Sequence, residues 1–541
     1  MEAVTGRTPQ WMTLDVVTAD TNGDLPTEIV GCIPAWLSGC LFRNGAGLYK
    51  VNGTNIRHFF DGFSVIHKFN VRDGQVTYRS SLLDTNTVAE AMGIKRLVPT
   101  KSGPKSIPDP CKSVFKGSQT YFAELPPERT DNTSVSVVEF ADALYALTET
   151  ATMNKIDRDS LKRTEMIDLS KIVSIHTGTA HPHFNPNGDM FTYGTSFDYR
   201  QAFNIVKIPR HLEGSNVQSM SDAEILASVP SRWQNYIAYN HSFGMSDRYF
   251  VLLDQPVTFN TKKFQISHVD MQGVAGTLVV KKGESLQFHV IDRQTSRRLP
   301  YTYETTSSFV FHFINCFEED GFLVVDLVLY HKVDAILDLY LESLRKTDFV
   351  IPDAGSFARF VLPLNLENAP CDINLVGLCR TKATAVIDYD NPKVVSLTPD
   401  YLRPEKIVLE LPRINYQKYA GKKYRFVYGS SVFSDCYRLV KVDLEEKTYK
   451  EWKQTQYYYP GEPIFVPAPD AVDEDDGVVM SPVLCETLEE PSFLLILDAK
   501  SFTELARAYI PRDVKMSMTF HGTFSDDTKS RNLFTSVDIH L

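Results

Sequence analysis

HKFNVRDGQVTY, residues 67–78, decides the fold, because the same arrangement recurs at 154–167, 288–301, 440–452 and 494–508. In each copy an aliphatic strand reaches an Asp or Asn, a short polar turn follows, and a second strand begins. The acidic or amide side chain can bond the backbone of its own turn, which favours a reversal. These residues are Asn70, Asp157, Asp292, Asp443 and Asp498. The pattern predicts a β-hairpin at each of them.

The spacing of the hairpins favours one architecture for the whole chain. Two strands alone are marginally stable, so many hairpins must pack together. Their irregular spacing excludes a fixed-period array but fits a β-propeller, whose blades tolerate long loop insertions. A pair of β-sandwiches is the competing arrangement. Residues 333–346 carry an apolar stripe at helical spacing, and 84–97 predict a second, shorter helix. No Pro/Gly/Ser-rich linker divides residues 1–541, so we expect a single all-β domain.

Bulk composition narrows the function. The 541 residues carry a net charge of −11, which argues against nucleic acid as a partner. The N-terminal stretch lacks the features of a signal peptide, and no apolar run approaches the ~20 residues of a membrane-spanning helix. The eight cysteines include no C-x-x-C pair, as expected for reduced thiols in a cytoplasmic protein. The glycine-rich stretch 42–53 is expected to be a loop, not a phosphate cradle, because no helix pattern follows it.

Twelve of the thirteen histidines divide into two groups by their local surroundings, and His183 is taken up below. Eight stand among charged, turn or exposed-strand residues: His58, His67, His176, His211, His268, His289, His331 and His540. Four stand among apolar or small residues at apparent strand ends: His181, His241, His312 and His521. A buried neutral imidazole needs partners for both nitrogens, or a metal on one and an acceptor on the other. The residues alone leave open satisfied core histidines and a metal site.

Three glutamates in similarly apolar company favour the metal site. They are Glu149, Glu410 and Glu462, and buried carboxylates are rare unless paired. Metal-bound histidines commonly donate their free N–H to a carboxylate. Imidazole ligands suit Fe, Cu, Zn or Ni, and the residue types do not choose among them. The histidines are spread from residue 181 to residue 521, and a radial fold would bring such distant strands to one axis.

Longer blocks carry a family likeness over nearly the whole chain. They include LFRNGAGLY, HFFDGFSVIHKF, PDPCKSVF, TAHPHF, YNHSFG, FHFINCFEEDGFLVVDL, LPRINYQKYAGKKYRFVYG, GEPIFVPAPDAVDEDDGVV and TFHG. In these blocks the chain resembles the carotenoid cleavage oxygenases, in the animal branch with the β-carotene oxygenases and the retinoid isomerohydrolase. The resemblance implies a seven-bladed β-propeller with a helical cap over a central Fe(2+).

The resemblance also assigns roles to individual residues. It implies that the metal ligands are His181, His241, His312 and His521, and that Glu149, Glu410 and Glu462 hydrogen-bond to ligands. In TAHPHFNPNG (179–188) local geometry leaves His181 and His183 equivalent, because residues i and i+2 share a face of a strand. The family motif selects the histidine before the proline, His181, and leaves His183 as a structural residue. NPNG is expected to form the turn that ends this strand.

The implied reaction is addition of O2 across one double bond of a carotenoid, which gives two aldehydes. Central 15,15′ cleavage to retinal is the preferred expectation, and the insect-type isomerooxygenase, which also forms an 11-cis product, stands beside it. The alternatives are eccentric 9′,10′ cleavage, an O2-independent retinyl ester isomerohydrolase, and a carotenoid-binding propeller without turnover. The iron ligands are common to all the enzymatic alternatives and do not separate them.

A membrane surface is the remaining implied partner, because the substrate dissolves in lipid. PDPCKSVF (108–115) resembles the family's membrane-contact segment, which makes Cys111 a candidate for acylation or contact, against the alternative of an idle thiol. The insert TKKFQISHVDMQG (261–273) is more polar than the apolar segment expected there. We therefore expect a shallow, peripheral contact rather than deep insertion.

Overall fold

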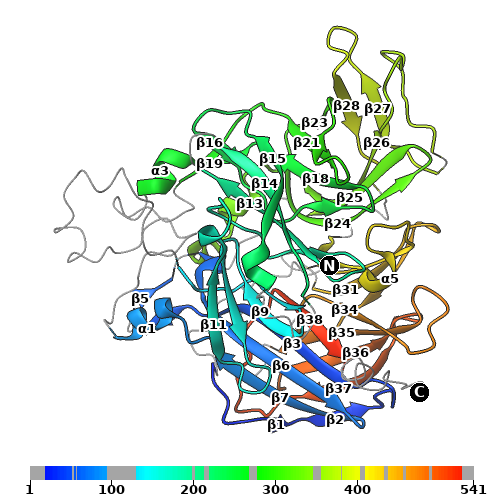
Figure 1. Ribbon diagram of the computed structural model, residues 1–541. Helices are drawn as coiled ribbons and strands as arrows, with labels where there is room; N and C mark the ends of the chain where they lie inside the picture. Colours follow the sequence, from blue (N-terminus) through cyan, green and yellow to red (C-terminus); the bar gives the residue numbers. More distant parts are fainter. Residues whose placement is uncertain are drawn as a thin grey trace, which may run out of the picture.

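The structure is a computed structural model, which describes residues 19–51, 54–56, 58–93, 130–197, 201–211, 219–266, 277–344, 355–378, 380–401, 408–431, 437–454, 458–485 and 490–526. Strands dominate these residues, and most of them belong to antiparallel sheets set around a common centre (Figure 1). Seven of the sheets are the blades of a β-propeller. The predicted all-β propeller is confirmed, and the sandwich alternative was wrong.

The first and last blades both combine strands from the two ends of the described chain. The first has the order β1 (Leu25–Pro26), β7 (Gln75–Leu82), β6 (Phe63–Arg72), β3 (Gly39–Leu48) and β38 (His521–Asp526). The last has β2 (Glu28–Gly31), β37 (Glu504–Tyr509), β36 (Phe493–Asp498) and β35 (Gly477–Cys485), with β33 (Tyr458–Pro460) and β34 (Ile464–Pro467) on β35. Both blades therefore join strands from the two ends of the described chain.

Five blades follow in chain order between them. The second contains β8 (Ser136–Phe140), β9 (Ala143–Leu147), β10 (Thr152–Ile156) and β11 (Arg163–Asp168). The third contains β12 (His183–Phe184), β13 (Met190–Ser196), β14 (Ala202–Ile208) and β15 (Glu224–Pro230). The fourth contains β17 (Gly244–Met245), β18 (Tyr249–Asp254), β21 (Leu286–Asp292) with β22 (Arg297–Arg298), and β23 (Thr302–Thr305), which β28 (Val394–Thr398) and β27 (Thr384–Ile387) extend.

The fifth blade contains β24 (Phe309–Glu319), β25 (Phe322–Tyr330) and β26 (Ser356–Pro363). The sixth contains β29 (Glu410–Arg413), β30 (Phe426–Ser430), β31 (Leu439–Asp443) and β32 (Thr448–Trp452). Two small sheets stand apart: β16 (Tyr236–Ala238), β19 (Val257–Asn260) and β20 (Leu278–Val280), and β4 (Lys50–Val51) with β5 (Thr54–Asn55). Inner strands of neighbouring blades pack on each other, as β38 does on β8 and β24 on β29. This packing brings distant segments to the axis.

All five predicted hairpins are present. The carboxylates of Asp157, Asp292, Asp443 and Asp498 accept backbone N–H bonds from two or three residues further on, as predicted. The role assigned to Asn70 was wrong, because it lies inside β6 and pairs across the sheet. The turn falls instead at residues 73–74, where φ is +50° and +72°. An Asp-Gly pair with two positive φ angles matches the twist of a two-residue hairpin.

The glycine-rich stretch 42–53 is not the expected loop, because its residues 42–48 belong to β3. The glycines there permit close contact rather than a turn. A Cβ on Gly45 would lie 2.3 Å from the carbonyl oxygen of Met518, so only glycine lets that segment pack against the strand. The stretch thus seats the chain segment that leads to His521.

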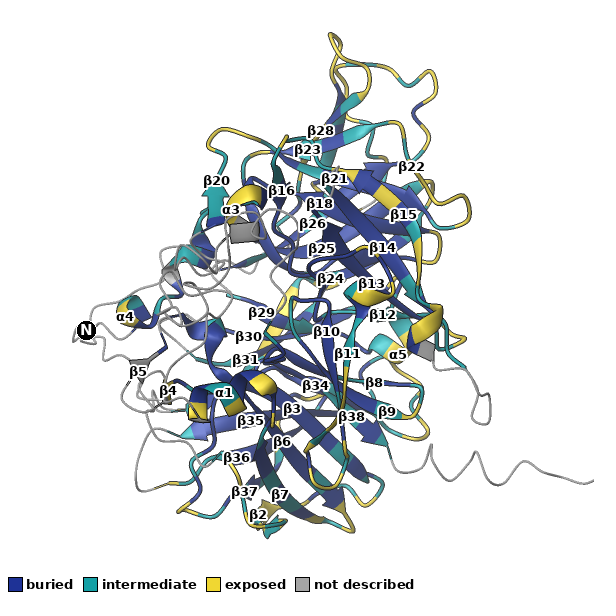
Figure 2. Cartoon of the chain, turned by 60° about the vertical axis from the view of Figure 1, so that its left-hand side comes forward, coloured by how far each residue is buried: buried dark blue, intermediate teal, exposed yellow. Residues whose placement is uncertain are grey.

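The helices are short, and α1 (Asn86–Gly93), α3 (Thr261–Ile266) and α4 (Leu341–Leu344) lie on one side of the propeller (Figure 2). The remaining helical turns are η2 (Phe59–Asp61), η3 (Leu169–Lys171), η4 (Ser219–Asp222), η6 (Ala335–Asp338) and α5 (Tyr416–Tyr419). The single helix expected over 333–346 was wrong, because it is divided into η6 and α4. The carbonyl of Leu339 accepts a bond from the backbone N–H of Phe59, and this bond replaces a helical one. In the described residues, no helix is long and apolar enough to cross a bilayer.

Candidate metal centre

The four histidines of the sequence prediction meet at the axis, although four different blades supply them. His181 precedes β12, His241 precedes β17, His312 lies in β24 and His521 begins β38. One side-chain nitrogen from each lies within 4.8 Å of the others, and the group could hold a metal ion. Each side chain is buried except that of His181, which is partly exposed.

The spacing of the facing nitrogens suits ligation. The Nε2 atoms of His181 and His241 are 2.8 Å apart, and those of His312 and His521 are 3.3 Å apart. Metal–imidazole bonds of about 2.1 Å at a right angle place two nitrogens roughly 3 Å apart. The imidazoles therefore already stand at the separation that a shared cation would impose.

Carboxylates fix the orientation of three of these rings. Nδ1 of His241 donates to Glu149 over 2.5 Å, and Nδ1 of His312 donates to Glu410 over 2.6 Å. Nδ1 of His521 likewise donates to Glu462 over 2.7 Å. Because each Nδ1 carries the proton, each Nε2 presents a lone pair to the centre.

His181 is held differently. Among the described residues no carboxylate bonds its ring, and its backbone N–H donates to the hydroxyl of Thr179 over 3.0 Å. That hydroxyl in turn donates to the backbone carbonyl of His241 over 2.6 Å. Thr179 thus ties the backbones of two neighbouring histidines together, in place of a carboxylate behind the His181 ring.

The electrostatic setting keeps the imidazoles of His181, His241 and His521 neutral. Burial lowers the pKa of His521 to about 3, even though Glu462 opposes the shift. Burial and the neighbouring histidines hold the pKa of His181 well below its ordinary value. Burial also lowers the pKa of His241, against the opposing effect of Glu149. Neutral rings are the form that coordinates a metal.

Two arginines, which sequence reasoning missed, surround Glu462. Arg43 is fully buried and donates NH1 to Glu462 Oε2, and Arg413 donates Nε to Oε1 over 2.7 Å. Burial alone would raise the pKa of Glu462, but Arg413, His521 and Arg43 outweigh it and hold that pKa far below its usual range. The signal was available, because both arginines stand in the apolar blocks LFRNGAGLY and LPRINY.

Two tyrosines donate hydrogen bonds to the other two carboxylates, Glu149 and Glu410. Tyr239 donates its hydroxyl to Glu149 over 2.6 Å, and Tyr330 donates its hydroxyl to Glu410. Burial opposes ionisation of Glu410, but its bonds with His312, Tyr330 and a backbone N–H lower its pKa overall. Nothing in the local sequence distinguished these tyrosines from the other twenty-three.

The histidine next to the cluster is satisfied without it. Nδ1 of His183 lies 2.8 Å from the hydroxyl of Tyr416, and Nε2 lies 2.9 Å from the carbonyl oxygen of Phe243. The expected turn follows, with Gly188 at φ +84°. His183 therefore lies outside the cluster, as the structural role predicted for it requires.

The sequence prediction of exposed surroundings was wrong for four of the eight remaining histidines. His58, His67, His176 and His289 are each at most 5% exposed, although their sequence neighbours suggested exposed strands and turns. His67 and His289 are buried inside strands β6 and β21, whereas His58 and His176 are buried outside the named strands. His211 and His331 are not buried, and residues 268 and 540 lie outside the described residues.

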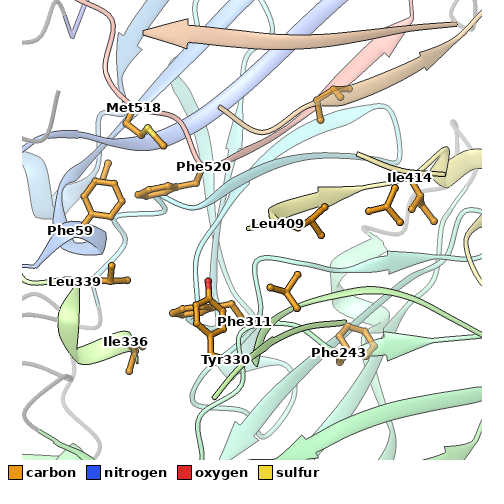
Figure 3. Close-up of a cluster of buried hydrophobic side chains, with 14 of the residues drawn as sticks. Phe59, Phe243, Phe311, Tyr330, Ile336, Leu339, Leu409, Ile414, Met518 and Phe520 are labelled. Atoms are coloured by element: carbon orange, nitrogen blue, oxygen red, sulfur yellow. The ribbon is translucent and has the colours of Figure 1, made fainter. Parts of the chain in front are cut away.

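An apolar, aromatic cluster adjoins the histidines on one side. The ring of Phe311 stands edge-on to His241 with centroids 5.5 Å apart, and Phe60 contacts both Phe311 and Phe520. Figure 3 shows Phe520 and Met518 beside Phe59, with Leu339 and with Ile336 of η6 below them. The candidate contact residue Cys111 lies outside the described residues, as do positions 267–273 of the polar insert.

Solved structures of other proteins share this fold. A β-propeller of this architecture is found in a variant of the Synechocystis apocarotenoid oxygenase, with a TM-score of 0.74 at 21% identity over 96% of this chain and 99% of that one. A cobalt-substituted form of that oxygenase gives a TM-score of 0.70, also at 21% identity, over 93% of this chain and 96% of that one. This likeness supports the propeller fold.

Residues 16–526 match the family described as retinal pigment epithelial membrane protein, and the chain belongs to that family. Human beta,beta-carotene 15,15'-dioxygenase is 35% identical over 511 residues, which cover 92% of each protein. The mitochondrial carotenoid-cleaving dioxygenase of Mustela putorius furo is 37% identical over 520 residues, 93% of this chain and 94% of that protein. The resemblance drawn from the sequence blocks is confirmed.

Proposed function

We propose that this protein is an iron(II)-dependent dioxygenase that cleaves one double bond of a carotenoid with O2 and releases two aldehydes. Central 15,15′ cleavage to retinal is the preferred reaction, in line with the relative named beta,beta-carotene 15,15'-dioxygenase. The observation that carries the proposal is the convergence of four imidazoles on one point at the propeller axis.

In this proposal the metal ligands are His181, His241, His312 and His521, each through Nε2. Bound by these four nitrogens, Fe(2+) would supply the activation of O2. The chain's own residues do the remaining work. The glutamates Glu149, Glu410 and Glu462 accept the Nδ1–H groups and so keep the lone pairs aimed inward.

The apolar cluster beside the histidines suits a polyene. Phe60, Phe311 and Phe520 present rings rather than hydrogen-bonding groups, so they favour a hydrocarbon over water. Exclusion of water protects reactive species from side reactions. In our proposal these rings position the polyene next to the iron ligands.

Product analysis tests the proposal. The iron-loaded protein is incubated with β-carotene in detergent under air, with His312→Ala as the matched inactive control, and the products are separated by chromatography. Retinal as the sole product is expected, and a share in the 11-cis form would add isomerisation. An apo-10′-carotenal with an ionone would move cleavage to the 9′,10′ bond. Unchanged carotenoid, with conversion of a retinyl ester under nitrogen, would overturn the dioxygenase.

We propose further that residues 1–541 act as one domain in the cytoplasm, in peripheral contact with a membrane surface that supplies the carotenoid. A substrate dissolved in lipid supports such a contact. Sedimentation with phospholipid vesicles tests it, and Cys111→Ser tests the contribution of that thiol. Protein that stays in the supernatant at every lipid composition would contradict the membrane contact.

A further inference from the structure

Strand β29 (Glu410–Arg413) contains a leucine with a left-handed backbone conformation, which its sequence does not predict. Leu411 is buried and has φ +50°, in the left-handed region that residues with large side chains rarely adopt. Unusual backbone conformations of this kind persist where the surrounding structure enforces them, and they concentrate at functional sites. The position of Leu411, directly after Glu410, raises the question of what the conformation achieves.

The pairing of β29 with β30 is irregular at Leu411. Glu410 pairs with Ser430 and Arg413 pairs with Tyr428, so three residue steps on β29 face two steps on β30. The extra residue is a β-bulge, and a residue with positive φ is the hallmark of one bulge type. Pro412 fits this place because it has no N–H to give to a ladder.

The bulge changes where two side chains point. Residues three apart in a regular strand face opposite sides of the sheet, because side chains alternate. Here both Glu410 and Arg413 reach the histidine centre: Glu410 accepts from His312 over 2.6 Å, and Arg413 donates to Glu462 over 2.7 Å. If β29 were a regular strand with the same three-residue separation, the two side chains would lie on opposite faces and one of these contacts would be lost.

The conformation also fixes the carboxylate directly. The backbone N–H of Leu411 donates to Glu410 Oε2 over 2.9 Å, and the same oxygen accepts from His312. Glu462, on the other side, accepts from both Arg413 and His521 through Oε1. A four-residue segment thus reaches two histidines, one through its first residue and the other through its last.

We propose that Leu411 is a positioning residue, whose left-handed conformation aligns Glu410 and Arg413 and so orients two of the four metal ligands at once. The proposal rests on the metal-binding role proposed above. Because Leu411 acts through the backbone, its replacement by glycine keeps the bulge accessible but no longer confines it, since glycine adopts positive and negative φ about equally. The ligands then lose part of their preorganisation.

Leu161 provides a matched control. It is also a fully buried leucine with positive φ, +61°, and it lies in the turn between β10 and β11. Leu161→Gly makes the same chemical change at a similar backbone conformation, but in a hairpin turn that supplies no histidine or glutamate of the centre. A loss of packing and a gain in chain entropy therefore affect both variants, whereas ligand orientation is affected only at Leu411.

The experiment measures cobalt(II) binding to metal-free wild type, Leu411→Gly and Leu161→Gly, by calorimetric titration and by the visible spectrum of the bound ion. Thermal unfolding of the metal-free proteins is recorded in parallel. Loss of outer hydrogen-bond partners typically weakens metal binding by 10–100-fold. We expect Leu411→Gly to bind cobalt about tenfold or more weakly with a changed spectrum, and Leu161→Gly to bind within about twofold of wild type.

The outcomes separate the two proposals. If wild type binds no cobalt, the metal centre itself is wrong. If wild type binds and Leu411→Gly binds equally well with the same spectrum, the positioning role is overturned. Equal weakening by both glycine variants would also overturn it, because it would reduce the effect to general destabilisation.

Discussion

Two halves of the histidine centre differ in what lies behind the imidazoles. The half formed by His312 and His521, here named the buried half, rests on carboxylates whose side chains are 4% and 1% exposed. The half formed by His181 and His241, the open half, has one described carboxylate, Glu149, whose side chain is 30% exposed. The same ring chemistry is thus anchored by buried charge on one side and by a partly hydrated group on the other.

The buried carboxylates of the centre thus lie behind His312 and His521. A buried carboxylate destabilises a protein unless partners compensate it, and those of the buried half have arginine, tyrosine and imidazole partners. Such a network admits few alternative geometries, so it fixes ligand positions before a metal arrives. The open half can adjust more readily. We therefore expect perturbations of the buried half to have the larger effects.

Removal of a ligand should show the largest contrast. His312→Ala takes away a proposed ligand and leaves the buried charge of Glu410 without its imidazole partner, and iron retention should be abolished. His181→Ala removes a ring that no described carboxylate bonds, so weakened but measurable iron binding should remain. Elemental analysis after desalting gives the iron content of both. Full iron retention by His312→Ala would refute its ligand role, and equal losses would remove the distinction between the halves.

Neutralising a carboxylate should separate the halves in stability. Glu462→Gln leaves the buried Arg43 without its anion, and breaking a buried pair costs about 3–5 kcal/mol of unfolding free energy. Glu149→Gln changes a partly hydrated group and should cost less than about 1 kcal/mol. Chemical denaturation of the metal-free proteins measures both. Similar losses in the two variants would contradict the contrast.

The same comparison extends to metal affinity. Glu410→Gln should keep the fold but weaken iron binding or turnover about 10–100-fold, since it alters the acceptor of a ligand's N–H. Glu149→Gln should weaken binding less than about tenfold, because water can replace part of the lost bond. Competition titration with a chelator gives both constants. A larger effect at Glu149 would reverse the assignment of the halves.

A further effect is expected on the pH dependence of stability, near the buried half. His67 lies 3.0 Å from the hydroxyl of Ser517, four residues before His521, and burial together with Arg43 lowers its pKa to about 3. Between pH 6.5 and 3 the unfolded chain binds this proton and the folded chain does not. Unfolding free energy should therefore fall as the pH falls, by about 1.4 kcal/mol per pH unit from this residue.

His67→Gln should remove that contribution. Unfolding free energy should then fall less steeply with falling pH than it does in the wild type. Denaturation midpoints measured from pH 7 to pH 4 provide the test. A slope unchanged by the substitution would show that His67 does not titrate as its burial requires.

Local chemistry was enough to predict the hairpins and the ligand candidates. Four turns follow from an aspartate bonding its own backbone, an interaction that spans two or three residues. The four histidines were recognisable from apolar surroundings and from the family motifs. Their convergence at one point required the propeller, which the irregular hairpins already favoured.

What the sequence did not reveal depends on distant partners. Arg43 and Glu462 are 419 residues apart in the sequence, so the local sequence around either residue does not indicate its partner. The helix expected over 333–346 is interrupted because Leu339 bonds a backbone group near residue 59. The left-handed conformation of Leu411 is likewise set by contacts on both sides of β29, and leucine carries no propensity for it. In each case tertiary structure overrode a local preference.

The most direct test of the central claim is a crystal structure of the iron(II)-loaded protein with anomalous data collected at the iron edge. The account predicts one strong anomalous peak at the propeller axis, within bonding distance of Nε2 of His181, His241, His312 and His521. It also predicts that the Nδ1 bonds to the glutamates persist. No peak there, or a peak bound by other side chains, would contradict the assignment of the centre.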